Sequence, residues 1–583
     1  MRPGSSGSSD VWGEAIGGLA RLVESLEAAG APSPTATHTA QVTALVERVA
    51  ALGDGHFVCA SVTRRRVFPL LALPEALVAE VLSHLCGKDL ARSASVSRAW
   101  YAQHEAAAVL RCARLGSSRL PARLPCESAS AALRFVEATA RRAPLAIASG
   151  SAHSMCIAPS GTAVLSWGGD SLGERAFRGH LGQGTLYGSP VAEPAAVAGP
   201  VGTRAREVAA RGYSCMLLTD DGRVYNWGWN EDGRLGHADG GGVIMKECLA
   251  RPTQLAALGG VRVVQVACGE RHGLALSDAG ELWSWGNQTH GQLGRGDDGG
   301  AGGALPPGRV AFASGVRILE ASAGGLHSLA VGAAGELYSW GAGRDGKLGH
   351  GDAAQQPRPR RVGGALGSRR CTHCSAGDGH SLVVADGGQL FSFGLGDFGR
   401  LGHGDERSRH APECVRALRG LAVVQASAGF YHSAVVVRGG QVYAFGDGAF
   451  GKLAAGSTED QLLPVRMQLA IGWSGVEIAE VAAGYQHTAI RTSAGVVLTC
   501  GIGWKGQLGC GDLREDQRVP IAVCRSLDTP PLQLRYASVL QRWGAASGTP
   551  GGSPTGVRSA APPRLAPGGY HAIGLGLAPH DDW

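Results

Sequence analysis

The chain has 583 residues, which is long enough for several domains or for one large array of repeats. Its formal net charge of +6 is small for this length, so nucleic acid is not the expected partner, although a contact with chromatin is left open. The 91 glycines follow no three-residue period, which excludes collagen and favours a fold with many tight turns.

No stretch comes near the roughly 18 consecutive apolar residues of a membrane span, so no membrane partner is expected. Glu14, Arg21 and Glu24 interrupt the apolar residues near the N-terminus, and no secretory signal is expected either. The 14 cysteines follow no pairing pattern, which favours a reducing, intracellular location in the cytoplasm, the nucleus or both. The motif Cys371-Thr372-His373-Cys374 lacks a second pair at a matching interval, and we expect no metal there.

Residues 1–68 are expected to form an N-terminal helical and flexible region. Within it, residues 10–30 and 40–52 have the apolar spacing of amphipathic helices, and Ala-Pro-Ser-Pro at 31–34 separates them. The residues assign no function to this region.

A small helical module is predicted for residues 69–115. Its first helix opens at Leu73-Pro74 and has apolar residues at i, i+4, i+5 and i+8 from Leu77, and Asp89 is a plausible N-cap for the next. A module of about 45 residues is too small to bury all of its apolar surface alone, so a partner is implied. Residues 116–144 are predicted to form a helical bridge.

The stretch LPEALVAEVLSHLCGKDLARSASVSRAW at 73–100 is similar to an F-box. The resemblance implies docking on the Skp-type adaptor of a cullin–RING ubiquitin ligase and, through it, on a cullin. The residues implied in adaptor binding are Leu73, Pro74, Leu77, Val81, Leu82, Leu85, Leu90, Val96 and Trp100. The alternative is an ordinary helical cap on the domain that follows.

Residues 145–528 contain seven repeats at intervals of about 52 to 62 residues. A repeat opens with Gly-x-x-His and an apolar run, has an aromatic residue before Gly about 16 residues later, and closes with Gly-x-Leu-Gly or a close variant. The repeated histidines are His153, His272, His327, His380, His432 and His487. The repeated aromatic residues are Trp167, Trp227, Trp285, Trp340, Phe393 and Phe445, and Cys500 takes their place in the last copy.

The pattern inside each repeat is that of β-strands. GELYSWG at 335–341 alternates apolar and polar residues, HSLAV at 327–331 is a short apolar run, and Asp278-Ala279-Gly280 is a hairpin signal. Short strands in a repeat of roughly 50 residues predict a mainly β fold, a seven-bladed β-propeller preceded by the small all-α module. Because equivalent positions cannot all be active sites, we interpret the histidines as buried hydrogen-bonding residues and the aromatic residues as packing between blades.

Three repeats depart from the pattern. The second has Arg211-Gly212-Tyr213-Ser214 where Gly-x-x-His is expected, the sixth has Ala454 in place of the closing Gly, and the first carries an insertion at 171–179. Irregular blades are candidate binding sites, but blades that close a ring are irregular for structural reasons as well.

The last part of the chain contains the opening motif of a repeat. Residues 529–564 are predicted to be a flexible linker rich in Pro, Gly and Ser, and residues 565–583 a latch strand and tail, because Gly568-Gly-Tyr-His571 repeats the opening motif.

The stretch ASAGGLHSLAVGAAGELYSWGAGRDGKLGHGD at 321–352 closely resembles the regulator of chromosome condensation repeat family, and the resemblance extends over roughly 145–525. It implies a seven-bladed propeller. With the F-box, it implies a non-enzymatic substrate-recognition subunit of an SCF-type ubiquitin ligase, with an unknown target protein on the propeller. The alternatives are a guanine-nucleotide exchange factor for a Ran-like GTPase and a general propeller scaffold.

Two further functions are disfavoured by residues of the repeat. Ultraviolet-perceiving members of the family carry Gly-Trp-Arg-His-Thr at blade openings, whereas the triplets here are Glu-Arg-His, Gly-Leu-His, Asp-Gly-His and Phe-Tyr-His. A dinucleotide enzyme is suggested by Gly394-Leu-Gly-Asp-Phe-Gly399, but no helical period follows it, so we interpret these as blade-turn glycines and expect no cofactor.

Overall fold

The computed structural model describes residues 144–523, apart from 170–178, 186–189, 200–202, 239–243, 246, 297–302, 314–315, 471–472, 474, 512 and 514–515. The described residues form seven antiparallel sheets of four strands each, which confirms the prediction of a mainly β, seven-bladed propeller. The expected N-terminal region at 1–68, F-box-like module, helical bridge, linker and latch lie outside the described residues.

Each blade is a meander of four consecutive strands. Blades 1 and 2 comprise β1 (Ile147–Ser149), β2 (His153–Ile157), β3 (Val164–Gly168), β4 (Val191–Ala196), β5 (Ala205–Arg211), β6 (Ser214–Thr219), β7 (Val224–Gly228) and β8 (Leu249–Gln254). Blades 3 and 4 comprise β9 (Val263–Cys268), β10 (His272–Ser277), β11 (Leu282–Asn287), β12 (Ala304–Arg309), β13 (Ile318–Ala323), β14 (His327–Gly332), β15 (Leu337–Gly341) and β16 (Gln356–Arg361).

Blades 5 to 7 follow the same plan. They comprise β17 (Cys371–Ala376), β18 (His380–Ala385), β19 (Gln389–Gly394), β20 (Arg409–Cys414), β21 (Val423–Ala428), β22 (His432–Val437), β23 (Val442–Gly446), β24 (Gln461–Arg466), β25 (Ile478–Ala483), β26 (His487–Thr492), β27 (Val497–Gly501) and β28 (Gln517–Ala522). Short 3-10 turns lie at η2 (Ala256–Leu258), η3 (Arg344–Gly346), η4 (Gly364–Leu366), η5 (Asp386–Gly388), η6 (Asp397–Gly399), η7 (Arg416–Leu418) and η8 (Ala449–Gly451). Among the described residues, no helix is long and apolar enough to cross a membrane.

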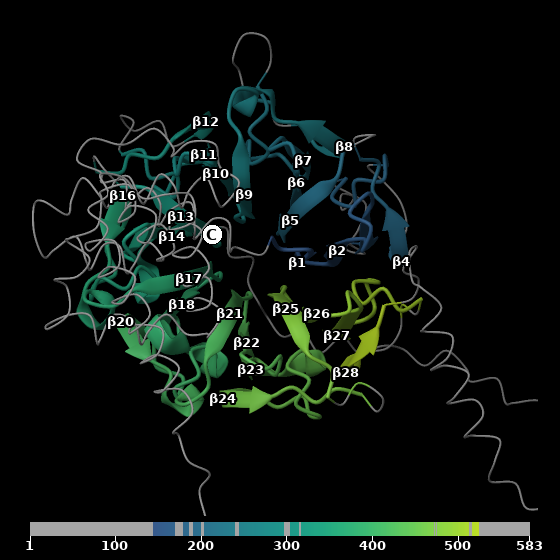
Figure 1. Ribbon diagram of the computed structural model, residues 1–583, viewed down its shortest axis with the longest axis vertical. Coiled ribbons are helices and arrows are strands. Elements are labelled where there is room, and N and C mark those ends of the chain that lie inside the picture. The colour runs from purple at the N-terminus through teal and green to yellow at the C-terminus, as the bar shows by residue number, and fades with distance from the viewer. Residues whose placement is uncertain are drawn as a thin grey trace, which may run out of the picture. The chain divides into compact units, whose positions relative to one another are not determined.

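The blades follow one another around a central axis in chain order, and the first strand of each blade is nearest that axis (Figure 1). The second strands are mostly apolar because neighbouring blades cover both of their faces: β14 is buried at every position. The fourth strands lie at the outside, and β16, with the sequence QPRPRR, is only partly buried.

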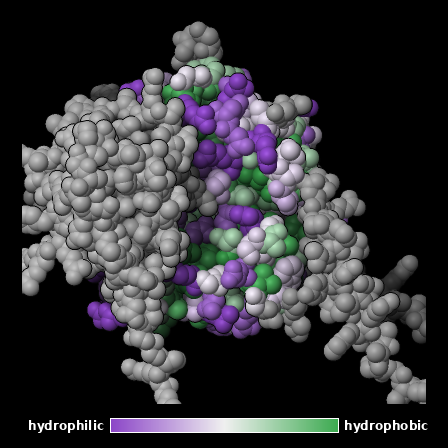
Figure 2. Space-filling view, in the orientation of Figure 1, coloured by the Kyte–Doolittle hydropathy of each residue, from purple (hydrophilic) through white to green (hydrophobic). Residues whose placement is uncertain are grey.

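Proline occurs in every one of these seven outer strands, at Pro194, Pro252, Pro306, Pro357, Pro412, Pro464 and Pro520, among others. Proline lacks the N–H that a further strand would need, so it blocks pairing at an exposed edge. On the face of the molecule shown in Figure 2, hydrophilic residues of the described chain are interspersed with smaller hydrophobic areas.

The core consists of seven apolar clusters, one at each junction between successive blades. The cluster between blades 7 and 1 contains Trp167 and Ala489. At the same junction the Glu480 carboxylate accepts hydrogen bonds from the backbone N–H groups of Ala146 and Ile147, at 2.9 and 3.0 Å. Described residues of blades 1 and 7 therefore close the ring, and the latch strand expected within 565–583 stays a prediction.

Candidate functional site

Two sets of loops emerge on the same edge of every blade. His327, the first residue of β14, pairs with Gly341, the last residue of β15, so the turn before β14 and the loop after β15 lie together. The other blades have the same register. We call the surface formed by the Gly-x-x-His turns and the loops between third and fourth strands the GxxH face.

The repeated histidines lie beneath this face and connect blades. The His327 Nε2 atom lies 2.9 Å from the Ser381 hydroxyl oxygen of the next blade, and His487 reaches Ser154 across the closing junction at 2.8 Å. The remaining pairs are His272–Ser328, His380–Ser433 and His432–Thr488 at 2.8 Å, and His153 with the Cys215 sulfur at 3.0 Å. All six histidines are buried.

The hydrogen-bond network determines the tautomer of these histidines. The Ser381 hydroxyl donates to the Lys347 carbonyl oxygen at 2.8 Å, so its oxygen is left to accept, and His327 Nε2 must carry the proton. Burial lowers the pKa of His272 to about 3 and that of His487 to about 4, which keeps both rings neutral at neutral pH. These histidines therefore have the properties of scaffold residues, not of general bases.

The repeated tryptophans connect blades through the same acceptors. The indole N–H of Trp340 donates at 2.9 Å to the carbonyl oxygen of Gln292, which also accepts from the Ser328 hydroxyl. In the same way the indole N–H groups of the other tryptophans donate to backbone carbonyl oxygens: Trp167 to Gln507, Trp227 to His180 and Trp285 to Arg234. Phe393 and Phe445 have no side-chain N–H and contribute packing alone. Phe393 is fully buried in the cluster between blades 4 and 5, and Phe445 in the cluster between blades 5 and 6.

The second blade departs from the pattern in a coupled way. A Cβ atom at Gly269 would lie 2.4 Å from the ring of His272, so a histidine at this motif requires the glycine. Where Ser214 replaces the histidine, that constraint is removed and Arg211 occupies the glycine position. The Arg211 guanidinium then donates to the Ala376 carbonyl oxygen at 3.1 Å, which joins blade 2 to blade 5.

A ring of buried polar residues was not predicted from the sequence. The variable residue of Gly-x-Leu-Gly is buried in every blade, and in four blades it is a cation: Arg234, Lys347, Arg400 and Lys452. Lys452 Nζ lies 2.8 Å from an Asp447 carboxylate oxygen and donates to Gln486. Burial lowers the pKa of Lys347 and of Lys452. The recurrence of a cation at one repeat position in the sequence could have indicated this ring of buried polar residues.

Exposed aromatic side chains gather on the GxxH face over blades 5 to 7. Phe398, Phe450 and Trp504 are 37%, 36% and 42% exposed and lie on the loops between third and fourth strands. On the Gly-x-x-His turns of blades 6 and 7, the ring centroids of Phe430 and Tyr485 are 4.4 Å apart. We call Phe398, Phe430, Tyr431, Phe450, Tyr485 and Trp504 the aromatic arc.

The backbone beneath the arc is in an unfavourable conformation. Phe398 and Phe450 have φ values of 60° and 62°, in the left-handed region. For a residue with a Cβ this conformation costs on the order of 1 kcal/mol, and a bulky residue there is a genuine outlier. Such outliers gather at functional sites, and here the strain presents two rings to solvent.

The aromatic arc also adjoins charged groups. The Arg400 guanidinium lies 5.5 Å from the Phe398 ring and 5.4 Å from the Tyr431 ring, within range of a cation–π contact. Phe450 borders a pocket of about 550 Å³ that is also lined by Thr458, Asp516 and Arg518. The arc therefore combines apolar area with neighbouring polar groups, as a protein-binding surface does.

Other predicted features are placed as follows. The nine residues implied in adaptor binding, Leu73, Pro74, Leu77, Val81, Leu82, Leu85, Leu90, Val96 and Trp100, lie outside the described residues. Cys371 and Cys374 are buried in the apolar cluster between blades 4 and 5, and His373 lies 2.6 Å from Glu320. In the Gly394–Gly399 stretch, β19 is followed by the single 3-10 turn η6.

Comparison with known proteins agrees with this geometry. The family model described as the RCC1-like domain matches residues 241–534, half of the chain, and the F-box domain model matches residues 70–103. The F-box predicted from residues 73–100 is thus confirmed as a sequence family. The chain is 33% identical over 372 residues to the ultraviolet-B receptor UVR8 of Arabidopsis thaliana, covering 64% of this chain and 80% of that protein.

The match to another relative is confined to part of that protein. Over 346 residues the chain is 34% identical to the human E3 ubiquitin-protein ligase HERC2, covering 58% of this chain and 7% of HERC2. Among solved structures, human WBSCR16 is similar, with a TM-score of 0.55, 25% identity, and coverage of 62% of this chain and 95% of that one. Yeast RCC1 (Prp20), bound to Kap60, has a TM-score of 0.52 at 21% identity, with coverage of 62% and 83%.

Proposed function

Because the chain belongs to the RCC1-like domain family and carries an F-box, we propose that it is a non-enzymatic substrate receptor of an SCF-type cullin–RING ubiquitin ligase. The F-box would bind the Skp-type adaptor through the apolar residues named from the sequence. The propeller would hold the target protein so that its lysines are within reach of the ligase. The observation that carries the proposal is the presence of an F-box and a propeller in one chain.

The target is proposed to bind on the GxxH face, at the aromatic arc. Aromatic residues are enriched at the centres of protein interfaces, where their large rigid area is desolvated on binding. The left-handed backbone at Phe398 and Phe450 supports this assignment, because both residues present an aromatic ring to solvent from this conformation. Asp345 occupies the same position in blade 4 with a φ of 60°, and no exposed ring results.

Nucleotide exchange on a Ran-like GTPase stays a prediction from the resemblance. The likeness to yeast RCC1 at 21% identity shows the fold alone. The absence of stimulated GDP release from Ran by the full chain would remove this alternative.

The proposal is tested by affinity purification with two sets of variants. Leu77→Asp with Leu82→Asp is expected to abolish recovery of the adaptor and to retain proteins bound to the propeller. Phe398→Ser with Phe450→Ser and Trp504→Ser is expected to do the reverse. Recovery of the adaptor by all forms, or by none, would contradict the assignment to the F-box, whereas unchanged propeller partners in the second set would contradict only the assignment to the arc.

A further inference from the structure

Blade 5 has an arginine where three other blades place an apolar residue. Two positions before the first strand, blades 3, 4 and 6 have Val261, Val316 and Leu421, and each packs against the apolar cluster at its junction. The equivalent residue of blade 5 is Arg369, and its side chain is exposed. The junction between blades 4 and 5 therefore lacks the apolar side chain that fills this place at those three junctions.

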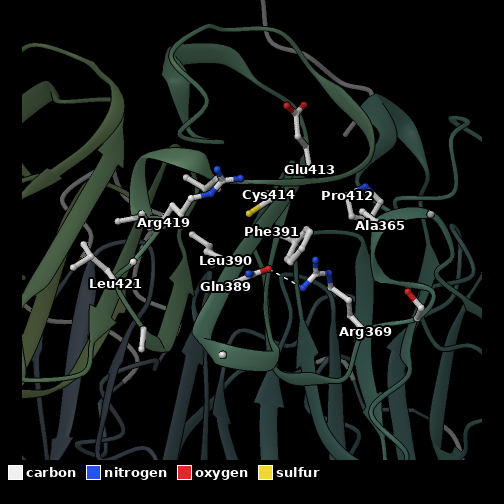
Figure 3. A pocket seen from close by; sticks show the side chains of 17 residues that line it. Ala365, Arg369, Gln389, Leu390, Phe391, Pro412, Glu413, Cys414, Arg419 and Leu421 are labelled. Atoms are coloured by element: carbon white, nitrogen blue, oxygen red, sulfur yellow. Dashed lines mark hydrogen bonds between the residues drawn. The ribbon is translucent and has the colours of Figure 1, made fainter.

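A pocket of about 600 Å³ lies beside Arg369. Leu390, Phe391 and Cys414 of blade 5 line it, and the connection from blade 5 to blade 6 contributes Arg419. In Figure 3, Arg369 and Arg419 lie on opposite sides of Phe391 and Cys414. The pocket adjoins the hairpin between β18 and β19, so it lies at the blade edge opposite the GxxH face.

The pocket has an excess of positive charge. Arg369 donates to the Gln389 side-chain oxygen at 2.8 Å, and its guanidinium lies 5.6 Å from the Phe391 ring. Within the described part of the chain, neither Arg369 nor Arg419 has a carboxylate at ion-pair distance. Glu413 is the acidic residue that lines the pocket, and its carboxylate is 2.7 Å from Arg409.

We propose that this pocket binds an acidic segment of a partner protein. A guanidinium on each side presents paired N–H donors that fit the two oxygens of a carboxylate or of a phosphorylated side chain. Leu390 and Phe391 are buried at the base of the pocket, and Gln389 orients the guanidinium of Arg369. Because the site lies opposite the GxxH face, it binds independently of the aromatic arc.

Fluorescence anisotropy with labelled decapeptides tests the proposal on the full chain. The probes are an alternating Ser-Glu peptide, the same peptide with phosphoserine, and an alternating Ser-Gln peptide. The two acidic probes are expected to bind and to be released by salt, and the uncharged probe is expected not to bind. The acidic probe that binds with the higher affinity shows whether the pocket prefers a phosphorylated or a carboxylate-rich segment.

The matched variant restores the residues of neighbouring blades, as Arg369→Leu with Arg419→Gly. Loss of two charge-assisted contacts is expected to weaken binding about tenfold or more. Arg262→Ala, in the connection between η2 and β9 of blade 3, removes an exposed arginine outside the pocket; it is the control and is expected to bind as the wild type does. If the first variant melts early, Arg369→Gln with Arg419→Gln replaces it, since similar polar side chains keep the surface intact.

Three results would overturn the proposal. One is no binding of either acidic probe by the wild type, and another is equal binding by the wild type and the double variants. The third is tighter binding of a single-stranded oligonucleotide at the same arginines, which would assign the pocket to nucleic acid. None of these measurements involves the adaptor, so the outcome is separate from that of the proposed ligase function.

Discussion

Ala454 of blade 6 and Cys500 of blade 7 are buried in the same apolar cluster. At the other six junctions a glycine faces an aromatic ring, and a Cβ atom on that glycine would lie 2.5–3.0 Å from the ring. The small cysteine side chain leaves room for the Ala454 methyl group, although Ala454 has a φ of 50°. Ala454 in place of glycine and Cys500 in place of an aromatic residue therefore compensate for each other in the packing of this junction.

This arrangement predicts a strong coupling between the two positions. Cys500→Phe alone is expected to destabilise the propeller by about 1–3 kcal/mol, because the ring overlaps the Ala454 methyl group. In the Ala454→Gly background the same change is expected to cost little, since the pair then matches Gly402 and Phe445 of the preceding junction. Urea denaturation of the four forms measures the coupling, and additive effects would contradict the account.

Stability is expected to fall as the pH is lowered below 6.5. Burial lowers the pKa of His272 to about 3 and that of His487 to about 4, and the other four repeated histidines shift in the same direction. Between pH 6.5 and these values the unfolded chain binds protons that the folded chain does not, so unfolding is favoured. At pH 5 the protonation of His272 and of His487 in the unfolded chain each lowers the free energy of unfolding by about 2 kcal/mol.

Thermal melting at pH 7.5 and pH 5.0 measures this effect. Burial raises the pKa of Glu270 and Glu480, which acts in the opposite direction, but these are two groups against six histidines. His487→Gln is expected to reduce the pH dependence by removing one titrating group. A melting temperature that does not change between the two pH values would show that the rings are not held neutral.

His373 occupies a repeat position at which glutamine bridges adjacent blades. Gln425 accepts from the Val481 N–H at 2.9 Å and donates to the Val481 carbonyl oxygen at 3.2 Å, whereas His373 Nε2 lies 2.8 Å from the Ala426 carbonyl oxygen. His373→Ala is expected to cost about 1–3 kcal/mol, because the partners of the ring are left unpaired. His373→Gln is expected to recover most of this loss. Equal denaturation midpoints for the two variants would refute the bridging role.

Relieving the strained backbone of the aromatic arc is expected to stabilise the propeller. Phe398→Asn places a residue that tolerates the left-handed region at a φ of 60°, and a gain of about 1 kcal/mol is expected. The same change is expected to weaken target binding, because an exposed ring is lost. A denaturation midpoint that falls instead of rising would mean that Phe398 contributes to the fold.

The contacts between repeats were predictable because they recur at a separation of about one repeat. The His327–Ser381 pair spans 54 residues and the His432–Thr488 pair 56, about one repeat each, so both partners stand out in the sequence. The Arg211–Ala376 contact spans 165 residues and occurs once. No period reveals such a contact, and the sequence therefore showed that blade 2 was irregular without showing what Arg211 binds.

The two proposed binding surfaces were harder to predict from the sequence. From the sequence, the loop around Phe398 shows only blade-turn glycines, because the exposure of the ring follows from a left-handed φ at a non-glycine residue. The blade 5 pocket depends on Arg369 standing where Val316 and Leu421 pack in neighbouring blades. That substitution becomes visible once the strand bounds align the blades.

We propose that this chain links a propeller to a ubiquitin ligase through its F-box. Isothermal titration of the purified Skp-type adaptor into the full chain tests it most directly, with Leu77→Asp, Leu82→Asp as the matched variant. We predict saturable one-to-one binding by the wild type and no detectable heat of binding by the variant, with the propeller melting temperature unchanged. Absence of binding by the wild type, or equal binding by both forms, would contradict the account.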